Sequence, residues 1–169
     1  MMRNKLLLIT ITLQVVFLLG MTASNYLIEK WGDVIQLQTE PYNPRDVFYG
    51  EYIQLDYVAE KVRPEYWFAT DKVKHNQVIY VLLTPDERGI YQVKAASNKK
   101  LDAHDDDVVI KARYQYEDYQ NIHRINFGVN RYYIEENSSL SLDLNRRMLV
   151  TIALSPWGQK KILKVEEME

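Results

Sequence analysis

Residues 148–165, which read MLVTIALSPWGQKKILKV, predict the fold class of this chain most directly. Apolar side chains recur at every second position from Met148 to Leu154. A period of two is typical of a β-strand that buries one face. Residues 156–158 (Pro-Trp-Gly) supply a turn, and a second strand follows over residues 160–165. The segment therefore predicts an antiparallel β-hairpin.

The same period recurs through the chain from residue 34 onward. We predict further strands at residues 34–38, 51–59, 77–84, 90–96, 108–117 and 123–129. Two stretches, 63–74 and 136–147, lack clean alternation, and each could hold a short helix. Seven or eight short strands in about 135 residues imply an antiparallel β-sandwich or barrel-like domain with one or two short helices. The fold class predicted is mainly β.

An uncharged apolar run precedes this β domain. Residues 6–24 (LLLITITLQVVFLLGMTAS) carry no charged side chain. As a helix they span roughly 28 Å, close to the roughly 30 Å hydrocarbon core of a bilayer. Arg3 and Lys5 precede the run, whereas every acidic residue follows it. This order favours a cytoplasmic N-terminus. We therefore predict a cytoplasmic tip at 1–5, a transmembrane signal anchor at 6–24, a juxtamembrane helix or linker at 25–32, and an extracytoplasmic β domain at 33–169.

A cleaved signal peptide is the alternative interpretation of this run. Small residues at 22–24 (Thr-Ala-Ser) offer a cleavage site before Asn25. The run is longer, however, than the roughly 7–15 apolar residues of a usual signal peptide. The helical pattern also continues beyond it, with Tyr26 and Trp31 suited to a membrane interface. We therefore expect an uncleaved anchor in the cell membrane.

Composition argues against several classes of function. A net charge of -2 gives no basic footprint for nucleic acid, and the absence of cysteine excludes disulfides, thiol nucleophiles and cysteine-based zinc sites. His75, His104 and His123 are not spaced as a metal-binding pair. We expect no cofactor and no metal, and we expect the Lys160-Lys161 pair to lie in solvent.

Charged residues gather just before the strand predicted at 51–59. Arg45 and Asp46 lie a few positions before Glu51, so these side chains can pair across a chain corner. Gly50 permits the positive φ that a turn into the strand can require. The cluster either stabilises the corner or forms part of a ligand or partner site.

Strand parity separates the aromatic residues of this segment. Tyr52 faces away from Leu55 and Tyr57, so the Y-x-x-L-x-Y spacing places two residues in the core and one tyrosine on the opposite face. A second tyrosine pair follows at 132–133. The candidate binding residues are Arg45, Asp46, Glu51, Tyr52, Tyr132 and Tyr133; the structural residues are Gly50, Leu55 and Tyr57; no catalytic residue is predicted.

Residues 44–57 (PRDVFYGEYIQLDY) also resemble the DPRD…GDYxxLxY signature of the GDYXXLXY family of bacterial membrane-anchored proteins. The resemblance continues at residues 126–136, with a glycine, paired aromatics and a glutamate. Glu51 replaces the aspartate of the motif, and Asn43 stands where an aspartate often precedes the proline. The resemblance implies a fold and an anchored topology, but no activity.

These features predict a single-pass protein of the bacterial envelope with a non-enzymatic role. We expect a binding or accessory module for another membrane or envelope component, held near the bilayer by the aromatic residues at 26–31. Two alternatives remain open. One is an envelope carbohydrate-binding protein or enzyme that uses the Arg45, Asp46 and Glu51 corner, and the other is a purely structural spacer.

Overall fold

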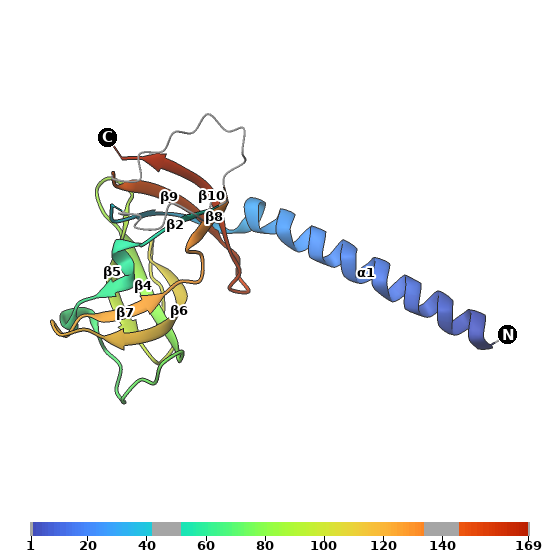
Figure 1. The fold of residues 1–169 in the computed structure, drawn as a ribbon, viewed down its shortest axis with the longest axis horizontal. Helices are drawn as coiled ribbons and strands as arrows, with labels where there is room; N and C mark the ends of the chain where they lie inside the picture. Colours follow the sequence, from blue (N-terminus) through green and yellow to red (C-terminus); the bar gives the residue numbers. More distant parts are fainter. Residues whose placement is uncertain (1, 42–51, 134–145, 169) are drawn as a thin grey trace.

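A computed structural model of the 169-residue chain describes residues 2–41, 52–133 and 146–168. A single long helix, α1 (Met2–Trp31), comes first and extends away from a β domain (Figure 1). Its segment Lys5–Ile28 is long and apolar enough to cross a membrane, a criterion that an N-terminal signal sequence also meets. The chain is therefore mainly β with one N-terminal apolar helix.

A three-stranded antiparallel sheet contains the predicted hairpin. Its order is β1-β9-β10, formed by β1 (Asp33–Gln38), β9 (Met148–Leu154) and β10 (Lys160–Glu167). Ile35 pairs with Ile152, which pairs in turn with Ile162. The alternation at 148–154 thus produces the central strand of this sheet.

A five-stranded antiparallel sheet of order β3-β7-β6-β4-β5 forms the second layer. Its strands are β3 (Lys61–Val62), β4 (Val78–Pro85), β5 (Tyr91–Ser97), β6 (Val108–Glu117) and β7 (His123–Asn126). The strands predicted at 77–84 and 90–96 form the hairpin β4–β5. The strand predicted at 123–129 ends earlier, at Asn126, because Gly128 adopts a positive φ of 78°.

Two short strands form a separate ribbon. β2 (Tyr52–Gln54) pairs with β8 (Arg131–Tyr133), with Tyr52 opposite Tyr133. The strand predicted over 51–59 thus stops at Gln54, because the chain turns into the 3-10 helix η1 (Val58–Glu60). A second 3-10 helix, η2 (Pro64–Tyr66), lies in the stretch 63–74, one of the two that could hold a short helix. Most of the other such stretch, 136–147, lies outside the described residues.

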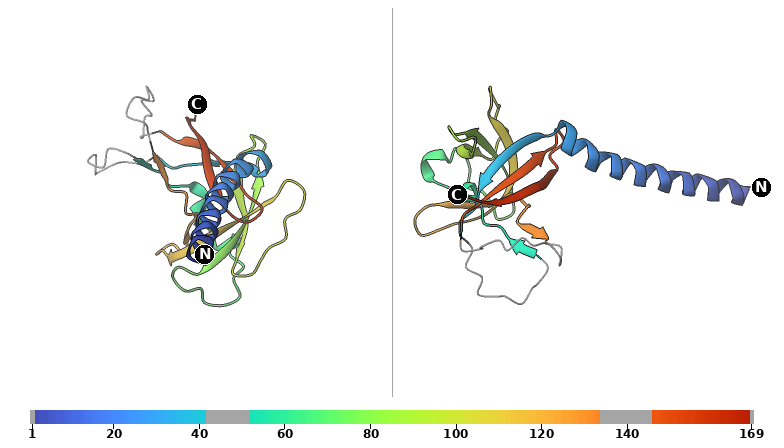
Figure 2. Two further views of the ribbon diagram at one scale, coloured as in Figure 1. Left: turned by 90° about the vertical axis from the view of Figure 1, so that its right-hand side faces the viewer. Right: turned by 90° about the horizontal axis from the view of Figure 1, so that it is seen from above.

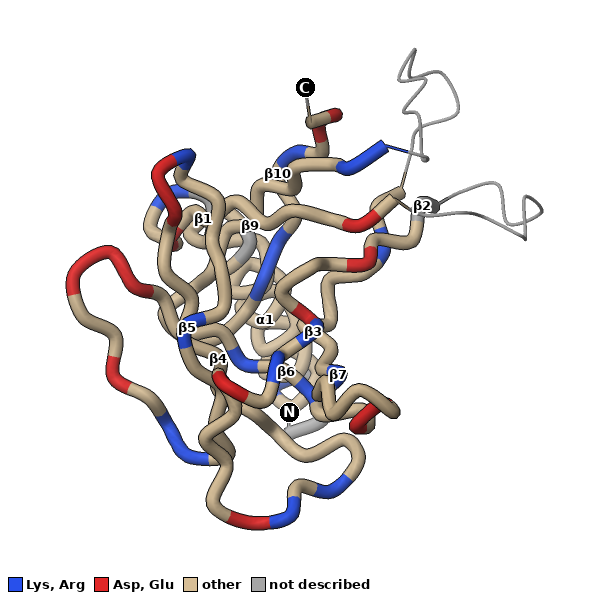
Figure 3. Tube along the Cα trace, turned by 90° about the vertical axis from the view of Figure 1, so that its left-hand side faces the viewer, with Lys and Arg blue, Asp and Glu red and all other residues tan. Residues whose placement is uncertain are grey.

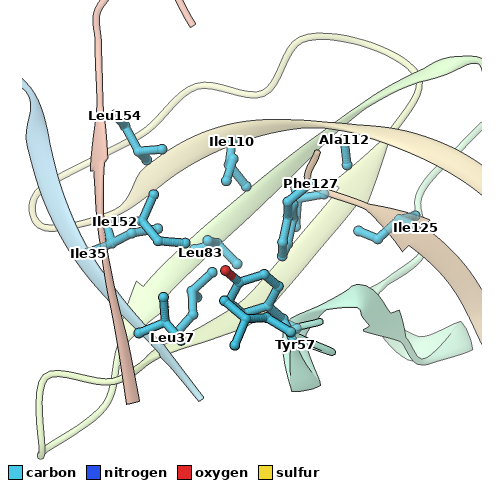
Figure 4. Close-up of a cluster of buried hydrophobic side chains, with 14 of the residues drawn as sticks. Ile35, Leu37, Tyr57, Leu83, Ile110, Ala112, Ile125, Phe127, Ile152 and Leu154 are labelled. Carbon is cyan, nitrogen blue, oxygen red and sulfur yellow. The ribbon is translucent and has the colours of Figure 1, made fainter. Parts of the chain in front are cut away.

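The sheets curl around one hydrophobic core in a nearly closed, barrel-like arrangement (Figure 2). An isolated bridge between Gln36 and Ile90 joins the edge of the three-stranded sheet to the start of β5. Figure 4 shows side chains of both sheets meeting around the ring of Tyr57. The largest fully buried residues are Tyr57, Phe127, Ile35, Leu37, Ile79, Leu83, Ile110, Ile152, Val62, Val81 and Val150.

The helix is attached to the domain at its C-terminal end. Ile28 is buried, and Gly32 N donates to Ile28 O at 3.0 Å where the chain leaves α1 for β1. Ser24 Oγ donates to Gln159 Oε1 in the β9–β10 turn at 3.0 Å. This turn lies on the side of the domain from which α1 extends (Figures 1 and 2).

Candidate functional site

The turn at residues 126–130, between β7 and β8, is the centre of the candidate site. Asn126 Oδ1 accepts a hydrogen bond from Gly128 N at 2.6 Å. An asparagine that bonds the backbone two residues on closes a tight turn, and glycine adopts the required positive φ without steric cost. The Asn-Phe-Gly sequence therefore folds locally into a tight turn, with Phe127 buried and Gly128 exposed.

The Y-x-x-L-x-Y segment holds this turn in place. Leu55 N donates to Asn130 O at 2.7 Å. The hydroxyl of Tyr57 donates to Val129 O at 2.9 Å, and the tyrosine is fully buried. Burial, with a smaller effect of the Glu60 charge, raises the pKa of Tyr57, so the hydroxyl stays a donor. Two residues of one motif thus bind two consecutive carbonyls of the turn.

A buried glutamate completes the support from the inner side. Glu60 is 5% exposed, and its Oε1 accepts from Phe127 N at 2.6 Å, while the side-chain amide of Asn130 lies 3.4 Å from both carboxyl oxygens. Desolvation raises the pKa of Glu60 to about 7, and the charge of Asp56 adds to this effect. The carboxyl group is therefore partly protonated at neutral pH.

Lys160 supports the same turn from the opposite side. Its Nζ donates to Phe127 O at 2.6 Å and to Lys111 O at 2.5 Å. Burial, opposed by the charge of Glu60 and assisted by the charges of Lys111 and Arg113, lowers the pKa of Lys160 from 10.5 to about 8. The peptide groups of Phe127 thus lie between a carboxyl group, which accepts from the N–H, and an ammonium group, which donates to the carbonyl.

A groove runs along both sides of this turn. Its wider part is a cleft of about 790 Å³ between the β2–β8 ribbon and β10. Its narrower part, about 360 Å³, lies between β6 and the 126–130 turn. Both parts are lined by Asn126, Gly128, Val129 and Lys160, so they adjoin at the turn. We call the two parts together the basic groove.

The charged side chains that line the groove are all cationic in the part of the chain that the structure describes. They are Lys111, Arg113, Arg131 and Lys160. Within the described part of the chain, no aspartate or glutamate lines either cavity. Figure 3 shows Lys and Arg near β6, and acidic residues both in outlying loops and near β2 and β3. The described lining of the groove is therefore positively charged, although the chain as a whole has a net charge of -2.

The structure brings together two of the candidate residues. Tyr132 and Tyr133 line the wider cleft, and Tyr133 is 66% exposed at its rim. Tyr52 is placed only by its backbone pairing with Tyr133. The other candidates, Arg45, Asp46, Gly50 and Glu51, lie outside the described residues, and their roles remain predictions.

Sequence reasoning missed the two ionisable groups nearest the turn. Lys160, expected in solvent, is half-buried. Strand parity could have indicated this, because Lys160 lies two residues before the inward-facing Ile162. Glu60 gave no such signal, since only the fold brings residues 60 and 127 into contact. Among the described residues, no group of three or more His, Asp or Glu could hold a metal ion.

Of the comparisons with known proteins, the one with protein-family models gives a match. No curated protein and no solved structure matches this chain. The family model of the GDYXXLXY proteins matches residues 14–165, which include the end of α1 and almost the whole β domain. Its Leu and final Tyr correspond to Leu55 and Tyr57, the two residues that bind the 126–130 turn. This chain belongs to the GDYXXLXY family.

Proposed function

We propose that this GDYXXLXY protein is a single-pass membrane-anchored binding module. Its N-terminus lies in the cytoplasm, α1 crosses the membrane, and the β domain binds another membrane or envelope component outside. The observation that carries this proposal is the cleft of about 790 Å³ beside the turn that the family motif supports. A concave surface with aromatic and amide side chains is typical of a binding site.

The ionisable groups near the groove support binding over catalysis. A general acid or base must reach a substrate proton at hydrogen-bond distance. Glu60 instead accepts from Phe127 N and Asn130, on the inner side of the turn. Lys160 donates to two backbone carbonyls. Both groups therefore serve to position the turn, and the wider cleft presents mainly amides, tyrosines and cations.

Site-specific photo-crosslinking in native membranes tests this proposal. A photoreactive amino acid replaces Gln54, an exposed lining residue of the cleft, in the full-length chain. The matched control places the same amino acid at Tyr119, a fully exposed residue in the turn after β6. We expect a discrete covalent adduct from position 54 that is absent from position 119.

A second variant links the adduct to the groove itself. Tyr132→Ala should remove most of the adduct formed at position 54, because Tyr132 supplies aromatic contact area in the cleft. An adduct that forms equally from positions 54 and 119 would contradict binding in the cleft. So would the absence of any adduct at position 54 in membranes of the host cell.

A further inference from the structure

Three cationic side chains converge on the narrower part of the basic groove. Lys111, Arg113 and Lys160 line it, together with Asn126 and the Gly128 turn. The charges of Lys111 and Arg113 both act on Lys160, so the three lie within electrostatic reach of one another. Like charges in close proximity destabilise one another, and an anion between them removes that cost.

Hydrogen-bond donors remain for such an anion. Lys160 Nζ uses two of its three donors, for Lys111 O and Phe127 O. Arg113 Nη1 donates to Asn76 O, which leaves further guanidinium N–H groups. The Nζ of Lys111 makes no hydrogen bond or ion pair within the described residues. An oxyanion with several acceptor oxygens would satisfy donors from all three side chains.

Among the described residues, Glu60 is the acid whose charge acts on Lys160, and its effect on the pKa of Lys160 exceeds that of Lys111 or of Arg113. Glu60 lies on the far side of the Phe127 peptide and is fully engaged there. Its charge favours the protonated form of Lys160, but its own carboxyl group is partly neutral near pH 7. Glu60 does not line the cavity, and the charged side chains that do line it within the described residues are all cationic.

The groove opens close to the expected membrane surface. Gly158 lines the narrower part, and the next residue, Gln159, accepts a hydrogen bond from Ser24 of α1. Ser24 ends the apolar run that we propose to lie in the bilayer, about 28 Å along the helix from its start. Trp157 in the same turn is 48% exposed, as is typical of an aromatic residue at a lipid headgroup layer.

We propose that the basic groove binds the phosphate group of an anionic phospholipid from the adjacent membrane leaflet. This inference rests on the proposed transmembrane placement of α1. The phosphate occupies the narrower part between Lys111, Arg113 and Lys160, and the remainder of the headgroup extends toward Tyr132 in the wider cleft. Basic pockets beside transmembrane helices are typical lipid headgroup sites.

Native mass spectrometry of the full-length protein in non-ionic detergent tests this site. The probe is dioctanoyl phosphatidylglycerol, and the zwitterionic dioctanoyl phosphatidylcholine is the lipid control. We expect one phosphatidylglycerol molecule to bind, with an affinity that falls about threefold in Lys111→Gln and about tenfold in Lys111→Gln/Arg113→Gln. Lys72→Gln, at an exposed lysine that lines none of the cavities described above, should bind like the wild type.

Folding of the variants is checked by circular dichroism, because Arg113 also binds Asn76 O. Lys111→Gln removes only an ammonium group that makes no hydrogen bond or ion pair within the described residues, and it therefore carries the test even if the double variant unfolds. Equal affinity of wild type and Lys111→Gln would overturn the proposed site. Equal binding of phosphatidylcholine would overturn it as well, because acyl chains would then drive association.

Competition identifies the source of the phosphate. Inorganic phosphate or glycerol 1-phosphate that displaces the lipid at equal concentration would assign the groove to a soluble phosphate instead. Displacement by hexaglutamate but not by these anions would assign it to an acidic polypeptide. Alkaline carbonate extraction tests the anchor separately. If the protein stays in the membrane yet binds no phosphatidylglycerol, the lipid site is contradicted and the proposed anchor is supported.

Discussion

At the scale of single residues, hydrogen bonds to the 126–130 turn decide the shape of the groove. The Tyr57 hydroxyl reaches Val129 O across the core, and the Leu55 amide reaches Asn130 O. A tyrosine is needed at position 57 because one side chain must fill the core and also satisfy a carbonyl. The terminal spacing L-x-Y of the motif therefore has a structural explanation that requires no catalysis.

Tyr57→Phe should destabilise the domain by about 1–2 kcal/mol. The substitution retains the ring but leaves Val129 O without its donor in a partly buried place. Thermal unfolding of the full-length protein in detergent, followed by circular dichroism, measures the effect. Tyr119→Phe, at a fully exposed tyrosine, is the control and should leave the midpoint unchanged. Equal midpoints for Tyr57→Phe and wild type would contradict the role of the hydroxyl.

Glu60 should make stability depend on pH. Its pKa is raised from 4.5 to about 7 in the folded protein. An acid with a raised folded-state pKa contributes its full stabilisation below pH 4.5 and loses it as the pH rises through about 7. We expect a loss of up to about 3 kcal/mol between pH 5 and pH 8. Melting temperatures across this range measure it.

Glu60→Gln isolates the contribution of this carboxyl group. The amide oxygen of glutamine can still accept from Phe127 N, but the side chain does not titrate. His123 has a lowered pKa, so its own contribution is lost as the pH falls and has the opposite slope. The readout is therefore the difference between variant and wild type. Parallel pH profiles would contradict the assignment to Glu60.

At the scale of elements, the backbone is closely packed at the junction between α1 and β1. A Cβ at Gly32 would overlap the carbonyl oxygen of Ile28 and lie 2.8 Å from that of Leu154 in β9. Both neighbours are backbone atoms, which cannot rotate away. Glycine at this position therefore lets the helix end directly against the three-stranded sheet, next to the buried Ile28.

Gly32→Ala should cost about 2 kcal/mol and loosen the attachment of α1 to the β domain. Gly20→Ala is the matched control, because nothing lies within 4 Å of a Cβ there and alanine favours a helix. Limited proteolysis near residue 32, together with thermal unfolding, measures both effects. Unchanged cleavage and stability in Gly32→Ala would show that the junction adjusts without cost.

Elements differ in how well the sequence predicts them. The long strands β4, β5, β6, β9 and β10 carry enough alternating positions to be recognised. β3 and β8 have two and three residues, too few for a period to emerge. Their pairing depends on partners that lie about 60 to 80 residues away along the chain.

At the scale of the whole molecule, the apolar helix and the β domain have separate surroundings in our proposal. The side chains of α1 from Leu6 to Leu19 are exposed, which suits a lipid environment but not water. The polar β domain buries its own core. The two parts meet at the Ser24–Gln159 contact and the Gly32 junction, so the domain would lie next to the bilayer.

Cysteine labelling tests this topology without background, because the natural chain contains no cysteine. A membrane-impermeant maleimide should label Lys72→Cys in intact cells, since Lys72 is exposed on the proposed extracytoplasmic domain. Lys5→Cys, on the proposed cytoplasmic side, should react only after permeabilisation. The reverse labelling pattern would contradict the orientation, and loss of the residue 5 segment from the mature protein would indicate a cleaved signal peptide.

The sequence alone determined the class of fold, the apolar N-terminal helix and the family, because these depend on local periodicity, run length and a short motif. It also singled out Tyr132 and Tyr133, which line the wider cleft. Only the tertiary structure decided that Glu60 and Lys160 enclose the Phe127 peptide and that Lys111, Arg113 and Lys160 share one cavity. Those residues come from different strands and turns, and local patterns carry no information about which distant segments the packing of the core brings together.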